Sequence, residues 1–216
     1  MTRSAFLRAR RPEHKQQRRE AILDAARELA VASGVRTVSL GAVAEAVGLA
    51  KSNIARYFGT KEEIYLHLAA EEGQRCAEAV AERLREVTGT AGAVTALAET
   101  LAERRLFCDL LSHLSTSLEH NVSVPAARAY KRAVHSQLAD LGKRVADVTD
   151  LTESEGVELV TAGVAMAGLL YPVVNPPPTI VQVYAEDPDL AATRLPFVPT
   201  LVRMLSAIAA GLPTLR

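Results

Sequence analysis

A short stretch near the N-terminus, Gly48 to Ile64 (GLAKSNIARYFGTKEEI), is rich in side chains that hydrogen-bond to nucleic acid. The apolar residues Leu49, Ile54 and Phe58 are spaced as if one side of this stretch were buried, which leaves the polar residues on the other side. The polar residues are Lys51, Ser52, Asn53, Arg56 and Tyr57. Such groups donate to base edges and to phosphate oxygens. The pattern favours a DNA-contacting helix face, although short helices with polar faces also occur on ordinary protein surfaces.

The charge of the 216-residue chain is zero overall but unevenly distributed. Residues 1–60 carry 11 Lys or Arg against 5 Asp or Glu, whereas residues 61–216 carry 14 against 20. A basic head on an acidic body indicates that the head contacts a polyanion. A solvated, disordered tail explains the basic residues of the first 19 positions equally well. Those residues are Arg3, Arg8, Arg10, Arg11, Lys15, Arg18 and Arg19.

The composition excludes several classes of protein. With 49% hydrophobic and 23% charged residues, the chain can bury a core and shows no sign of disorder. Cys76 and Cys108 lack metal-ligand spacing, so they are expected to be reduced thiols of a cytoplasmic protein. No signal peptide is expected, and the longest apolar run, Ala162 to Val174, is too short to span a membrane. We therefore expect no membrane partner.

No group of residues has the spacing of a catalytic or metal site. His113 and His120 are seven residues apart and do not form an i, i+4 ligand pair. Cys108 and His113 could face one pocket, but the sequence supplies no third group to complete a catalytic set. A glycine-rich phosphate loop and a C-x-x-C motif are also missing. We expect no enzyme activity, no metal and no cofactor.

Two short helices joined by a tight turn are expected to position the polar residues. A first helix is expected over about 13–33, and Gly34 follows it as the stop. Ser39 is expected to cap a second helix over about 40–47. Gly48 turns the chain into a third helix over about 51–57. Thr60 and Glu63 form a capping box that opens a long helix ending near Val87. This order is typical of a helix-turn-helix.

Residues Ala21 to Ala69 resemble the TetR family of bacterial transcriptional regulators. They contain, in order, an apolar helix, a glycine, Thr-Val-Ser-Leu, a short helix ending at Gly48, the Tyr57-Phe58 pair and Thr-Lys-Glu-Glu-Ile. The resemblance implies an all-α fold, in which a three-helix helix-turn-helix domain is joined by a long helix to a larger ligand-binding and dimerisation domain. The expected division is a basic flexible arm at 1–12, the DNA-binding domain at 13–60 and the larger domain at 61–216.

The resemblance also implies a function and a set of DNA contacts. It implies a ligand-responsive repressor that binds a pseudo-palindromic double-stranded DNA operator as a homodimer and is released by a small apolar effector. Lys51, Ser52 and Asn53 would face the major groove, and Ser39, Tyr57 and Lys61 the backbone. The full expected set is Ser39, Lys51, Ser52, Asn53, Arg56, Tyr57, Thr60 and Lys61.

Three residues depart from the family pattern. Gly41 replaces an arginine that reads bases in some members, Ala50 replaces the usual Ser or Thr cap, and Ala55 replaces a frequent tyrosine. These departures keep a second hypothesis open, namely a helical ligand-binding or interaction protein with weak or lost operator recognition.

The larger domain is expected to contain helices over about 91–119, with a break near Arg104, and over 125–147, 152–174 and 197–210. The resemblance implies that the last two helices pair with their copies across a two-fold axis, although an ordinary internal core fits the same stripes. The expected interface residues are Val160, Val164, Ala167, Val198, Leu201, Leu205 and Ile208.

An apolar effector pocket is expected inside the 91–174 bundle, closed in part by the proline-rich connection 175–196. The residues expected to line this pocket are apolar or weakly polar, so an apolar or aromatic ligand is favoured over a highly charged one. They are equally compatible with a plain core. The expected lining is Phe107, Cys108, Leu111, Ser115, Met166, Leu170 and Tyr171.

Overall fold

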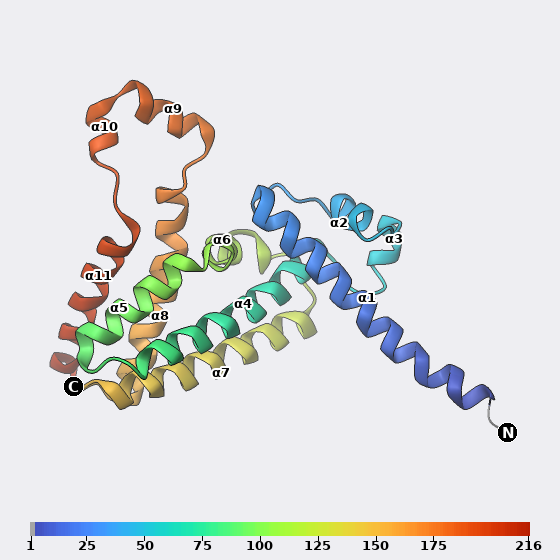
Figure 1. The fold of residues 1–216 in the computed structure, drawn as a ribbon, viewed down its shortest axis with the longest axis horizontal. Helices are drawn as coiled ribbons and strands as arrows, with labels where there is room; N and C mark the ends of the chain where they lie inside the picture. Colours follow the sequence, from blue (N-terminus) through green and yellow to red (C-terminus); the bar gives the residue numbers. More distant parts are fainter. Residues whose placement is uncertain (1–2) are drawn as a thin grey trace.

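The computed structural model describes the backbone of residues 3–216 and the side chains of residues 13–216. Throughout the described backbone, every regular element is a helix, which confirms the all-α prediction. A small N-terminal head and a larger helical body are joined by the long helix α4 (Lys61–Leu84) (Figure 1).

The head is formed by α1 (Arg3–Ser33), α2 (Leu40–Ala46) and α3 (Lys51–Ile54), which pack near the beginning of α4. The side chain of Ser39 accepts a hydrogen bond of 3.1 Å from the backbone N–H of Ala42 and caps α2. Gly48, with φ of 64°, makes the turn between α2 and α3, as predicted. The head is therefore a helix-turn-helix.

The body contains α5 (Gly89–Glu103), α6 (Arg105–His113), the π-helical turn η1 (Leu114–Leu118), α7 (Val124–Val148) and α8 (Glu153–Val174). The last long helix is α11 (Phe197–Gly211), which packs on α5 and α8 and is followed by the 3₁₀ turn η2 (Leu212–Leu215). In Figure 1, α4 and α7 lie side by side along the length of the body, in agreement with their many contacts.

Close backbone approach holds α7 and α8 together at their adjoining ends. Gly142 and Gly156 face each other so closely that a Cβ atom on Gly156 would overlap the carbonyl of Gly142. The N-terminus of α8 is fixed by a capping box in which Thr152 and Glu155 exchange hydrogen bonds. Arg216 donates to both carboxylate oxygens of Glu155, at 2.8 and 2.7 Å.

Two hydrophobic cores fill the molecule, and the second crosses from the head into the body. One core lies among α4, α5, α6, α7, α8 and α11. The other combines Ile22, Val43 and Ile54 of the head with Leu110 and Tyr130 of the body. The head consequently shares buried apolar surface with α6 and α7. A shift of either helix would therefore change its packing against the head.

Between α8 and α11 the chain forms a projecting arm of two short helices, α9 (Pro178–Glu186) and α10 (Pro188–Ala192) (Figure 1). Neither helix contains a buried residue. The arm exposes several large apolar side chains, namely Ile180, Val181, Val183, Leu190 and Leu195.

Several boundaries differ from those predicted. The first helix begins at Arg3 rather than near 13. Met1 and Thr2 lie outside the described residues. The third helix ends at Ile54, three residues early, and Ala50 provides no side-chain cap for it. The break at Arg104, between α5 and α6, is present as predicted.

Candidate nucleic-acid interface and internal cavity

The helix-turn-helix displays the polar residues that the sequence singled out. Ile54 is completely buried and Phe58 nearly so, which fixes the orientation of α3 and the turn after it. Lys51, Ser52 and Arg56 are exposed, and Asn53 and Tyr57 are partly exposed. The side chains of these five residues form no hydrogen bond within the described part of the chain. They therefore form a polar face that is free to contact an external partner.

The other three expected DNA contacts have structural roles within the chain. Ser39 caps α2, and the Thr60 hydroxyl caps α4 while donating to the carbonyl of Asn121 at 2.8 Å. The Lys61 ammonium donates to the carbonyl of Val38 at 3.0 Å and lies 5.9 Å from the centre of the Tyr65 ring. Contact of Lys61 with a phosphate would require this internal bond to be released or shared.

The predicted capping box at α4 is only half formed. Thr60 accepts from the backbone N–H of Glu63 at 3.2 Å, but Glu63 reaches back to the N–H of Gly59 instead of that of Thr60. Its other carboxylate oxygen accepts from the N–H of Ser123 at 2.9 Å, and hydrogen bonding from Ser123 lowers the pKa of Glu63. Glu63 therefore joins the head, α4 and the beginning of α7.

Some basic side chains of α1 are also used internally. The Arg19 guanidinium stacks over the Phe58 ring at 4.4 Å, and one of its nitrogens lies 3.1 Å from Nε2 of His67. Burial and the charge of Arg19 lower the pKa of His67, so its ring is neutral and can accept this hydrogen bond. Arg27 pairs with Glu71 of α4 at 2.5 Å. These contacts fix α1 against α4 and reduce the positive charge available to a polyanion.

The head is joined to the body by a direct hydrogen bond as well as by shared core. The backbone N–H of Val35, in the connection between α1 and α2, donates to Oδ2 of Asp109 in α6 at 2.8 Å. The other carboxylate oxygen of Asp109 lies 3.5 Å from Nε2 of His113. A side chain of the body thus satisfies a buried backbone donor of the head.

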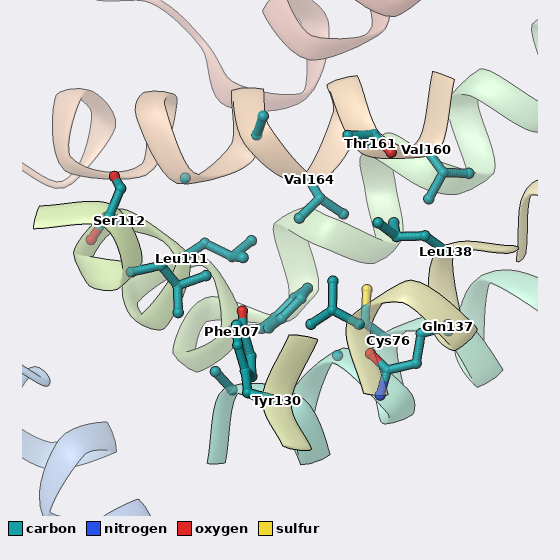
Figure 2. Close-up of a pocket in the computed structure, with 18 of the residues that line it drawn as sticks. Cys76, Phe107, Leu111, Ser112, Tyr130, Gln137, Leu138, Val160, Thr161 and Val164 are labelled. Atoms are coloured by element: carbon teal, nitrogen blue, oxygen red, sulfur yellow. The ribbon is translucent and has the colours of Figure 1, made fainter. Parts of the chain in front are cut away.

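The body contains a cavity of about 580 Å³ between α4, α5, α6, η1, α7 and α8 (Figure 2). This volume lies within the range of roughly 300–1,000 Å³ found for small-molecule sites. Of the expected lining, Phe107, Leu111 and Ser115 do line it. The prediction was wrong for the remaining four, which lie outside the lining because they pack in or against the hydrophobic core of the body. These are Cys108, Met166, Leu170 and Tyr171.

The cavity also differs from the prediction in what surrounds it. The connection 175–196 contributes no lining residue, so it does not close the cavity as expected. Large parts of the wall come from α4, which lies outside the expected 91–174 bundle, and from α7, which lies within that bundle but supplied none of the expected lining residues. Figure 2 shows Cys76 of α4 and Tyr130, Gln137 and Leu138 of α7 around the space. The apolar stripe Tyr130, Val134, Leu138 and Leu141, interrupted by the polar Gln137, is the signal that could have indicated this wall.

Both thiols are buried and protonated. Burial raises the pKa of Cys76 and of Cys108 to about 12, and Cys108 Sγ donates to the carbonyl of Leu101 at 3.1 Å. A thiol with such a pKa is a poor nucleophile at neutral pH. His113 faces Asp109 instead of Cys108. Within the described residues, no group of three or more His, Cys, Asp or Glu side chains could hold a metal ion.

The expected dimer residues are mostly internal. Leu201 and Leu205 are completely buried, and Leu205 lies near Gly163 of α8, so neither can face a second copy. Val160 and Ala167 are buried as well, while Val164, Val198 and Ile208 are partly buried. The prediction chose the apolar stripes of α8 and α11 that pack inside the chain.

A second apolar surface on the same two helices remains exposed. The exposed apolar residues are Val173 of α8, Met204 and Ala207 of α11, and Ala165 and Leu169 of α8, of which the last two also belong to the cavity lining. By length and composition alone, Glu153–Val174 and Phe197–Leu215 could each cross a membrane, but core and interface helices of a globular protein pass the same test. Both helices expose apolar side chains in the single chain.

Comparison with known families accounts for nearly the whole described chain. Residues 22–68 match the family described as "Bacterial regulatory proteins, tetR family". Residues 70–216 match the family described as "Tetracyclin repressor-like, C-terminal domain". A search of curated proteins gave no match.

Solved structures of bacterial regulators share the fold. A TetR transcriptional regulator from Rhodococcus sp. RHA1 superposes with a TM-score of 0.56 at 17% identity, over 94% of this chain and 98% of that one. The fatty acid degradation regulator FadR from Bacillus halodurans gives 0.52 at 14% identity, over 90% and 93%. A TetR-family regulator from Streptomyces coelicolor gives 0.51 at 22% identity, over 89% and 98%.

Identities this low establish the fold alone, whereas the family match to residues 70–216 covers more than half of the chain. The matched family consists of regulators and not of enzymes. The chain therefore belongs to the TetR family and is a DNA-binding transcriptional regulator.

Proposed function

We propose that this regulator is a cytoplasmic repressor that binds a pseudo-palindromic operator as a homodimer and releases it when a small molecule occupies the internal cavity. The observation that carries the proposal is the direct connection between cavity and head. Phe107 and Leu111 of α6 line the cavity, and Asp109 of the same helix holds the Val35 amide of the head. A ligand that displaces α6 changes the position of the helix-turn-helix.

The exposed side chains of α3 and its turn support the DNA-binding role. Lys51, Ser52 and Asn53 supply cationic, hydroxyl and amide groups to the major groove, and Arg56 and Tyr57 supply donors to the backbone. The positions of Ser39, Thr60 and Lys61 at the beginnings of α2 and α4 favour phosphate contacts, because helix N-termini attract anions. Ser39 and Lys61 also contribute to DNA binding by orienting these helix ends, because Ser39 caps α2 and Lys61 donates to the carbonyl of Val38.

The exposed apolar faces of α8 and α11 support a homodimer. A two-fold dimer formed by these faces would bury Val173 and Met204, which are 48% and 38% exposed in the single chain. It would also present two equivalent helix-turn-helix heads, and therefore require two related half-sites in the operator.

Binding of the purified protein to DNA from the region upstream of its own gene, measured over a series of salt concentrations, tests this function. The expected result is sequence-selective binding that weakens steeply with salt. A protein that bound this DNA no better than random DNA would contradict the proposal.

One observation favours the alternative of a helical interaction protein with weak operator recognition. The third helix has only four residues, and Ala50 gives it no side-chain cap. The same titration separates the two functions, because weak recognition would give equal affinity for specific and random DNA at every salt concentration.

A further inference from the structure

The internal cavity has different chemistry at its two ends. Where α6, η1 and the first half of α7 meet, the wall carries hydroxyl groups. These belong to Ser112, Ser115, Thr116 and Tyr130. The other end is mainly apolar and is formed by Cys76, Leu97, Leu138, Leu141 and Val160. Its two polar residues, Gln137 and Thr161, donate within the chain to the carbonyls of Ala70 and Val157. In Figure 2, Ser112, Leu111 and Tyr130 lie at one side of the space, and Leu138, Cys76 and Val160 at the other. Such a cavity matches a molecule with one polar end.

The Tyr130 hydroxyl belongs to the cavity lining and is available to a ligand. The residue is only 8% exposed, yet its hydroxyl oxygen is not fully enclosed by protein, and it forms no hydrogen bond to the described residues. Figure 2 shows the Tyr130 ring between the backbone of α7 and the cavity, with its oxygen at the end nearer Phe107. Burial raises the pKa of Tyr130, and the charge of Glu119 raises it further, so the group is a protonated donor. A donor that faces a cavity can be stabilised by an acceptor bound there.

The neighbouring hydroxyls are less available as donors. Ser112 Oγ donates to the carbonyl of Asp109 at 2.7 Å, and Thr116 Oγ1 donates to that of His113 at 3.4 Å. Their oxygens can accept hydrogen bonds, but their protons are already used. Ser115 Oγ also forms no hydrogen bond to the described residues, but Ser115 is exposed to solvent. Tyr130 is therefore the largely buried donor that this end of the cavity offers to an acceptor atom.

The charges in the cavity wall favour a neutral molecule. Glu119 and Lys131 are the two charged residues of the lining, and they pair with each other at 2.6 Å. Because the two charges neutralise each other, the pair offers no net charge to attract a ligand carboxylate or ammonium. The Lys131 side chain is 64% exposed, so water solvates it and no ligand anion is needed to neutralise it.

We infer that the cavity binds a neutral, mainly apolar molecule whose carbonyl-type oxygen accepts a hydrogen bond from Tyr130 while its apolar part lies between Cys76, Leu138 and Val160. The inference rests on the proposed function, since it identifies the chemical class of the effector. The expected class of effector is narrowed from apolar or aromatic molecules to apolar molecules with one neutral hydrogen-bond acceptor.

Calorimetric titration of the full chain without DNA, using three straight-chain probes of similar length, tests the inference. The probes are 2-undecanone, decanoate and decylamine. The ketone should bind saturably and more tightly than either ion. Tyr130→Phe removes only the hydroxyl and should weaken ketone binding by about 3- to 10-fold. Tyr171→Phe makes the same chemical change outside the lining and should leave the affinity unchanged.

A further variant tests whether the ketone binds inside the cavity. Val164→Phe fills space in the cavity and should abolish binding of all three probes. Thermal melting of each variant, with circular dichroism as the readout, establishes that the fold is retained. Failure of the ketone to bind, tighter binding of decanoate, or equal affinities for Tyr130→Phe and the unaltered chain would each overturn the inference.

Release of operator DNA is measured separately, so that the two proposals can be distinguished. If the ketone binds through Tyr130 but leaves DNA affinity unchanged, the cavity inference is supported and the proposed effector response fails. If an ionic probe releases DNA without the ketone binding, the repressor function is supported and the inference about ligand class fails.

Discussion

The carboxylate of Asp109 and the backbone N–H of Val35 form a hydrogen bond of 2.8 Å that connects a cavity-lining helix to the helix-turn-helix. The two residues are 74 positions apart in the sequence. Val35 is buried, so its N–H cannot exchange this partner for bulk water without movement of the head. The bond makes the position of α6 relevant to the position of the DNA-binding surface.

Asp109→Ala should lower the free energy of unfolding by about 1–3 kcal/mol, because it leaves the buried Val35 amide without an acceptor. The variant should also respond less to effector, since α6 has lost its direct bond to the head. Urea unfolding and DNA affinity with and without 2-undecanone measure the two effects. Asp140→Ala, at an exposed position of α7, is the control. Identical behaviour of the two variants would exclude a coupling role for Asp109.

Asn53→Ala should reduce the affinity for operator DNA by about 1–3 kcal/mol and leave binding to random DNA nearly unchanged, if the amide reads a base. Lys61→Ala should weaken binding to both kinds of DNA and lower the salt slope by about one. It should also destabilise the head, because the Val38 carbonyl loses its 3.0 Å hydrogen bond. Fluorescence anisotropy with operator and random duplexes measures these effects. Equal losses on both duplexes for Asn53→Ala would exclude base reading by that residue.

Val173→Glu combined with Met204→Glu should give a folded monomer that no longer binds the operator tightly, because two exposed apolar positions of the proposed interface become charged. Sedimentation velocity gives the oligomeric state, and anisotropy the DNA affinity. Val124→Glu, at a position that is 68% exposed on α7, is the matched control. Retention of a tight dimer by the double variant would place the interface elsewhere. In contrast, Leu201→Glu should unfold the chain, because Leu201 is completely buried.

Gly156→Ala should destabilise the protein by about 1–3 kcal/mol, because its Cβ would overlap the Gly142 carbonyl and force α7 and α8 apart. Gly211→Ala is the control, since a Cβ at Gly211 meets nothing within 4 Å and its φ of −80° suits any residue. Chemical unfolding of both variants measures the difference. Similar midpoints for the two would show that the helices can separate without cost.

Hydrogen bonds from Arg216 lower the pKa of Glu155 from 4.5 to about 2, and the Thr152 amide contributes. A carboxyl whose pKa is lower in the folded state stabilises the protein fully above its unfolded pKa. This contribution should therefore be present at neutral pH and disappear as pH falls from about 4.5 to 2. Thermal melting from pH 7 to pH 2 should show a steeper loss for the unaltered chain than for Glu155→Gln. Parallel curves would contradict the role of this pair.

The sequence by itself determined the helices and the reading head. Periodic apolar residues, the Ser39 and Thr152 caps and the Gly48 turn are local signals, because capping and turn formation depend on residues three or four positions apart. Ile54 and Phe58 likewise fix the polar face of α3 within a few residues. Local signals were weaker at helix ends, as the early start of α1 at Arg3 shows.

The tertiary structure alone decided which apolar residues face a partner, a cavity or the core. Leu201 and Val173 are both apolar residues of apolar helices, yet one is buried against α5 and α8 and the other exposed. Tyr130 reaches the cavity because α7 lies along α4, and Val35 reaches Asp109 because α6 lies beside the head. These pairings join residues tens of positions apart. They depend on how whole helices fit together, which the spacing within one helix does not specify.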